Sequence, residues 1–171
     1  MTYEIERSRE KTQRRREREA EVRVLHGIAR LWSKKLGDFY VLVDDHSPPQ
    51  AGSSWWTDEN DVNPEIDVED MKRVAAAATT PQWRAIDYAL THLREARAAR
   101  ARDLRVARDK GIDDPPRISP EHIDTLRRAM EEVEHAIEEL AQLSDDRYPP
   151  EWLEPRINRS KEHGGWRPVS E

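Results

Sequence analysis

The feature that most constrains this sequence is a regular spacing of apolar residues between positions 123 and 140. These residues follow one another at intervals of alternately three and four: Ile123, Leu126, Met130, Val133, Ile137 and Leu140. Such intervals place all six on one face of an α-helix, in the heptad pattern typical of coiled coils. Because Ser119 and Pro120 make a favourable N-cap and first helical residue, we expect a long helix to begin there.

A second long helix is predicted over residues 81–110, with Thr80 as its N-cap, Pro81 as its first residue and Gly111 just beyond its end. Its apolar residues recur at the same kind of interval: Trp83, Ile86, Leu90 and Leu93. The connection between the two helices is short, which favours antiparallel neighbours. We therefore expect a coiled-coil-like helical hairpin over residues 81–143.

The distribution of charge favours the same pairing. Residues 81–110 contain eight basic and four acidic residues, whereas residues 111–146 contain three basic and eleven acidic ones. Opposite charges favour this arrangement over contacts between like-charged helices. Counting outwards from the connection, we expect Leu93 to lie near Ile137 and Leu90 near Leu140.

Residues 3–36 are predicted to form one long helix with two different halves. No apolar residue occurs from Glu6 to Glu19, so we assign residues 1–20 to a charged helical arm that has nothing of its own to bury. Gly37 is expected to cap the other end of the helix. Five apolar residues in the second half recur at helical spacing and predict a face that packs on the core: Val24, Leu25, Ile28, Leu31 and Trp32.

Residues 39–43 predict a short strand, because β-branched and aromatic residues dominate the sequence Phe-Tyr-Val-Leu-Val. A single strand needs a partner, so we expect a β element near residues 39–57. A long loop over residues 44–64 and a short helix over residues 65–78 follow, and together with the hairpin they complete a core of residues 21–146. Residues 147–171 are rich in proline, glycine and charge without periodicity, and they predict an extended tail.

The predicted fold is therefore mainly α, and the composition excludes several classes of protein. The chain has no cysteine, which rules out disulfide frameworks and thiolate metal sites. It has no apolar run long enough to span a membrane and no apolar leader, so we expect no membrane partner and a cytoplasmic or virion-associated location. Glycine-rich phosphate loops and nucleophile elbows are absent from the sequence, and we expect no cofactor.

The best enzyme hypothesis is a divalent metal site at Asp44, Asp45 and His46. These residues directly follow the predicted strand, and carboxylates and imidazole are metal ligands and general bases. The ordinary alternative is a solvated polar loop, since catalysis also needs a pocket and converging side chains. A metal-dependent enzyme is therefore the second alternative function.

The leading hypothesis is a non-enzymatic protein that assembles with a protein partner or with copies of itself, such as a bacteriophage structural or host-interacting factor. The charged arm, the lone strand and the tail each have an open side that needs a partner. The predicted partner-binding residues are Arg14, Arg15, Arg16, Trp55, Trp56, Trp152 and Trp166. The first alternative is nucleic-acid binding through the arginines of the N-terminal helix and the basic helix 84–110.

Overall fold

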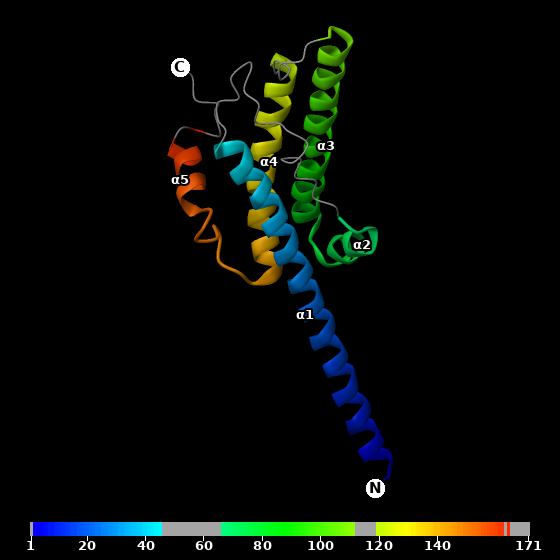
Figure 1. Ribbon diagram of the computed structural model, residues 1–171. Coiled ribbons are helices and arrows are strands. Elements are labelled where there is room, and N and C mark those ends of the chain that lie inside the picture. Colours follow the sequence, from blue (N-terminus) through cyan, green and yellow to red (C-terminus); the bar gives the residue numbers. More distant parts are fainter. Residues whose placement is uncertain (1, 46–65, 112–118, 163, 165–171) are drawn as a thin grey trace.

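The computed structural model shows an all-helical chain within the residues that it describes (Figure 1). It describes residues 2–45, 66–111, 119–162 and 164, with the side chains of 2–9 and 45 excepted. The helices are α1 (Thr2–Asp45), α2 (Val68–Ala77), α3 (Thr80–Asp109), α4 (Pro120–Ser144) and α5 (Glu154–Glu162). The prediction of a mainly α fold is confirmed, and none of these helices combines the length and apolar character of a membrane span.

Helix α4 lies at the centre of the bundle, with α3 along one side and α1 along the other (Figure 1). It runs antiparallel to both. Its heptad-spaced face is the heart of the core, since five of the six predicted residues are wholly buried and the sixth, Ile123, is partly buried: Leu126, Met130, Val133, Ile137 and Leu140. Short α2 lies against α1 and leads through a tight turn into α3.

The register between α3 and α4 differs from the predicted one by five to six residues. The predicted pairing would place position 127 opposite Asp103 and position 148 opposite Gln82. Instead Asp103 contacts His122, and Gln82 contacts Gln142. The observed register is supported by a local anchor, because the Asp103 carboxylate accepts the backbone N–H of Ser119 (3.0 Å) and so ties the start of α4 to α3 six residues before α3 ends.

The predicted helix starts are correct to within a few residues. Ser119 caps α4 as expected, accepting the backbone N–H of His122. The N-cap of α3 is Thr79 rather than Thr80, because Thr79 and Gln82 form a reciprocal capping box. Helix α2 begins three residues later than predicted, at the residue after its N-cap Asp67.

The predicted strand at residues 39–43 is wrong. Helix α1 continues without a break through Gly37, which is therefore not a C-cap, and ends at Asp45. Phe39, Tyr40 and Val43 are at most 1% exposed. Their spacing is that of a helix face, and burial against the bundle outweighs the preference of β-branched residues for strands. Positions 46–57 of the predicted β element lie outside the described residues.

The tail is not wholly extended, because residues 154–162 form α5. Leu153 and Ile157, four residues apart, are fully buried and fix this short helix beside α1 and α4 (Figure 1). Polar contacts with α1 and α4 hold it as well. Arg156 Nη1 lies 2.8 Å from Asp44 Oδ2, and Ser160 Oγ donates to Glu134 Oε2 at 3.2 Å. Burial raises the pKa of the Glu134 carboxyl, and the Ser160 hydrogen bond opposes that rise.

Candidate interaction surface

One heptad-spaced row of side chains runs along α1 from its buried end to its exposed end. We call this row the α1 seam: Lys11, Arg15, Arg18, Val22, Leu25, Ala29, Trp32, Leu36, Phe39 and Val43. The last five are at most 2% exposed in the bundle core. Leu25 is partly buried, Val22 is 49% exposed, and the three cations are fully on the surface. The core-facing side of α1 therefore continues well beyond the part that the rest of the described chain covers.

The uncovered part, residues 10–24, is exposed at every position, and we call it the α1 projection. It extends past the lower end of α4 into solvent (Figure 1). Two side-chain contacts run along it, from Arg15 to Glu19 and from Gln13 to Glu17. Such contacts support an exposed helix only weakly. Beyond its base beside α2, the projection is exposed at every position, so the described part of the chain gives it little tertiary packing.

The predicted basic cluster of Arg14, Arg15 and Arg16 is split between faces of this helix. At 3.6 residues per turn, Arg15 lies in the α1 seam, Arg14 lies beside it, and Arg16 lies outside it. Glu19 and Glu21 border the seam on its two sides. The cations of the projection therefore form a narrow row flanked by carboxylates, not a broad basic surface.

A groove of about 630 Å³ lies between the base of the projection and α2. Val22 and Val24 on α1, each about half exposed, contribute to it. The lining is mostly apolar, with single charges at the edge: Ala20, Glu21, Val22, Val24, Leu25, Arg73, Ala76 and Ala77. Adjacent apolar side chains left open to solvent are typical of a contact site.

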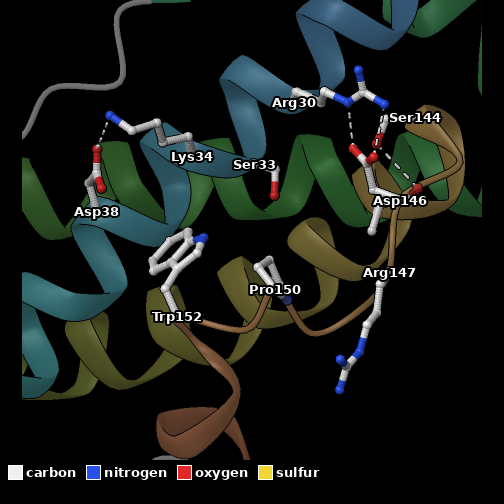
Figure 2. Close-up of a pocket in the computed structure, with 10 residues that line it drawn as sticks. Arg30, Ser33, Lys34, Asp38, Ser144, Asp146, Arg147, Pro150 and Trp152 are labelled. Carbon is white, nitrogen blue, oxygen red and sulfur yellow. Dashed lines mark hydrogen bonds and ion pairs between the residues drawn. The ribbon is translucent and has the colours of Figure 1, made fainter.

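A second hollow of about 370 Å³ surrounds Trp152, one of the predicted partner-binding residues (Figure 2). Arg30 meets Asp146 through two bonds of 2.8 and 2.9 Å, and Lys34 lies 3.7 Å from Asp38. The hydrogen bond from Arg30 lowers the pKa of the Asp146 carboxyl. Because each of these lining cations faces its own carboxylate, the hollow has no concentrated charge with which to attract an ionic ligand.

Trp152 rests on its own chain, with its ring against the backbone of Gly37 and 48% of its surface exposed. A Cβ at position 37 would overlap that ring, whereas a Cβ at Gly27 would meet nothing within 4 Å. We therefore expect Gly27→Ala to raise the free energy of unfolding by about 1 kcal/mol, the usual gain from alanine in a helix. Gly37→Ala should give no such gain, because the indole must move.

Urea denaturation of the two variants, and of each combined with Trp152→Ala, measures this difference. In the Trp152→Ala background the Gly37→Ala gain should return to about that of Gly27→Ala. An equal gain for Gly37→Ala in the presence of Trp152 would show that the ring does not lie where the structure has it.

The predicted metal ligands are not brought together by the described residues. Asp44 is 11% exposed and is held by Arg156, with Arg159 Nη1 3.9 Å away. The Asp45 side chain and His46 lie outside the part that the structure describes, as do Trp55, Trp56 and Trp166. Within the described ranges, no three histidines or carboxylates are grouped as a metal site would need.

Sequence reasoning missed a buried polar cluster where the last turns of α3 meet the first turn of α4. His122 is 1% exposed, and its Nδ1 lies 2.9 Å from the Asp103 carboxylate that also holds Ser119. Burial lowers the pKa of His122, and the Asp103 contact opposes that shift. Histidine three residues after a serine N-cap was the only signal in the sequence.

Comparisons with protein-family models, with curated proteins and with solved structures found no match.

Proposed function

We propose that the protein is a non-enzymatic interaction protein that assembles with a protein partner, another copy of itself included, through the α1 projection. The α1 seam is the observation that carries this proposal. It is fully buried from Ala29 to Val43 and open from Lys11 to Val22, although its spacing does not change. A helix face that continues beyond its own bundle is available to another chain.

The groove beside α2 supports the same function. Burial of apolar surface favours association between chains, and Val22, Val24 and Leu25 offer such surface at the base of the projection. The cations further along would add orientation and faster encounter more than affinity. The apolar groove and the row of cations together fit a protein partner better than either feature does alone.

Nucleic-acid binding is the alternative that a specific observation favours, since Lys11, Arg15 and Arg18 stand in one exposed row. Phosphate contacts require cations, and these three are spaced along about 10 Å of helix. Glu19 and Glu21 on either side keep this row narrow, whereas a phosphate backbone calls for a broader basic surface, which is why we place this alternative second. The metal-dependent alternative has less support, because Asp44 is engaged by α5.

Site-specific photo-cross-linking tests the proposal, because the chain has no cysteine. We expect Val22→Cys labelled with benzophenone to give one defined polypeptide product, either with purified protein alone or in extract of the source cells. The matched control is Val106→Cys on α3, equally exposed at 50% but outside the seam and the groove. It should give no product.

The outcomes separate the functions. A product from Val22→Cys that contains nucleic acid would support the alternative instead. The proposal fails if position 22 yields no polypeptide product, or if position 106 yields the same products as position 22.

A further inference from the structure

We infer that the α1 projection receives an acidic amphipathic helix, apolar at the end beside α2 and carrying Asp or Glu along the row from Arg18 to Lys11. This inference rests on the proposed function, because it specifies the partner surface that the projection would accept.

The buried half of the seam shows which kind of helix it accepts. Helix α4 packs antiparallel on α1, and its segment 129–144 contains five glutamates and no lysine or arginine. An amphipathic helix therefore already lies on this seam within the chain, through buried apolar residues on both sides. The preference for carboxylates follows from the cations of the open half alone. A partner helix at the lower end of α4 would continue the same contact along α1, past Leu25 and Val22 to the cations.

The chemistry of the open half changes along its length. Nearest the bundle, Val22 and Leu25 border the apolar groove with Ala76 and Ala77 of α2. Farther out, the seam positions are Arg18, Arg15 and Lys11, whose long side chains can lie along a partner helix while their charged ends meet its carboxylates. Arg15 already meets Glu19 of its own helix at 2.8 Å, and a partner's carboxylate would share or replace that exposed pair. From residue 25 to residue 11 the seam is about 21 Å long, which corresponds to four turns of a partner helix.

The same charges disfavour a second α1 projection as the occupant. In a parallel pair each of Lys11, Arg15 and Arg18 would face its own copy across the seam, and an antiparallel pair would still place cation near cation. Like charges at such positions select against self-pairing. A double-stranded nucleic acid presents phosphates across a wider surface, and it therefore suits this narrow row, bordered by Glu19 and Glu21, less well than one stripe of carboxylates on a helix does.

A fluorescein-labelled peptide of about 21 residues, helical and carrying leucine at two seam-facing positions and glutamate at the next three, is the probe. Its binding is measured by fluorescence anisotropy against the full chain. We expect Arg15→Glu combined with Arg18→Glu to weaken binding by about tenfold or more, because two attractive contacts become repulsive. A peptide with lysine in place of the three glutamates should show the reverse preference and bind that double variant.

The matched control is Arg16→Glu combined with Arg23→Glu, which makes the same change of charge at exposed positions outside the seam. It should bind the acidic peptide as the unmodified chain does. The inference is overturned if both double variants lose binding equally, if neither does, if the acidic peptide does not bind the unmodified chain, or if duplex DNA displaces it from the projection. In any of these cases a polypeptide cross-link from Val22→Cys would still leave the proposed function standing.

Discussion

Phe39→Ala should lower the free energy of unfolding by about 3–5 kcal/mol, one of the largest effects of any single substitution in this chain. The Phe39 ring is 1% exposed and belongs to the central cluster of the core, where α1 packs on α4. Removing it leaves a cavity that the rigid helices cannot close. Urea denaturation with a common m-value for variant and unmodified chain measures the loss.

Two comparisons make this expectation specific to a helix. Leu31→Ala removes an apolar side chain from the same helix where it is 48% exposed, and should change stability by less than about 0.5 kcal/mol. Val43→Ala should cost about 2 kcal/mol, clearly more than Val41→Ala, because Val43 is fully buried and Val41 only partly. Equal costs at 41 and 43 would contradict the helix, since those two residues share a face only in a strand.

The misassigned strand shows what local pattern can and cannot decide. Five consecutive apolar residues at 39–43 fit a buried helix as well as a strand, and their β-branched content tips the local preference. What decides the outcome is α4, about ninety residues further on, whose surface buries Phe39 and Val43 together. The 3,4 spacing from Val22 to Val43 was nevertheless present in the sequence, and following it through Gly37 would have shown both the helix and the α1 seam.

Helices α3 and α4 and their caps were largely predictable because their signals are local. Ser119-Pro120 and the heptad face of α4 act within one or two turns, and both appear as expected. Helix α5 was less predictable, because its stabilisation comes from Leu153 and Ile157 packing on other helices and not from its own polar composition. The register of α3 on α4 was not predictable from spacing alone, and it includes contacts of the Asp103 carboxylate with Ser119 and His122 that no spacing rule conveys.

We expect Asp103→Ala to lower the free energy of unfolding by about 2–4 kcal/mol, because it leaves two donors without their acceptor in a sheltered site. Those donors are the backbone N–H of Ser119 at 3.0 Å and the ring Nδ1 of His122 at 2.9 Å. Asp103→Asn, which keeps one acceptor oxygen, should cost less. Asp124→Ala on the exposed face of α4 is the control and should change stability by under about 0.5 kcal/mol.

The pH dependence of that cost identifies His122 as the second partner. Burial and the nearby charges of Arg100 and Arg102 lower the pKa of His122, whereas the Asp103 carboxylate opposes them by stabilising the protonated ring. A histidine whose pKa is lower in the folded state than in the unfolded chain costs stability as the pH falls below its ordinary value of about 6.5. Asp103→Ala removes the opposing group and lowers that pKa further.

The cost of Asp103→Ala should therefore be greater near pH 5.5 than near pH 7.5, because the protonated His122 ring is what the carboxylate stabilises. Urea titrations of the variant and the unmodified chain at both pH values measure the difference. A cost that is the same at both values would mean that Asp103 stabilises only the Ser119 backbone, and that protonation of His122 is not linked to folding through this contact.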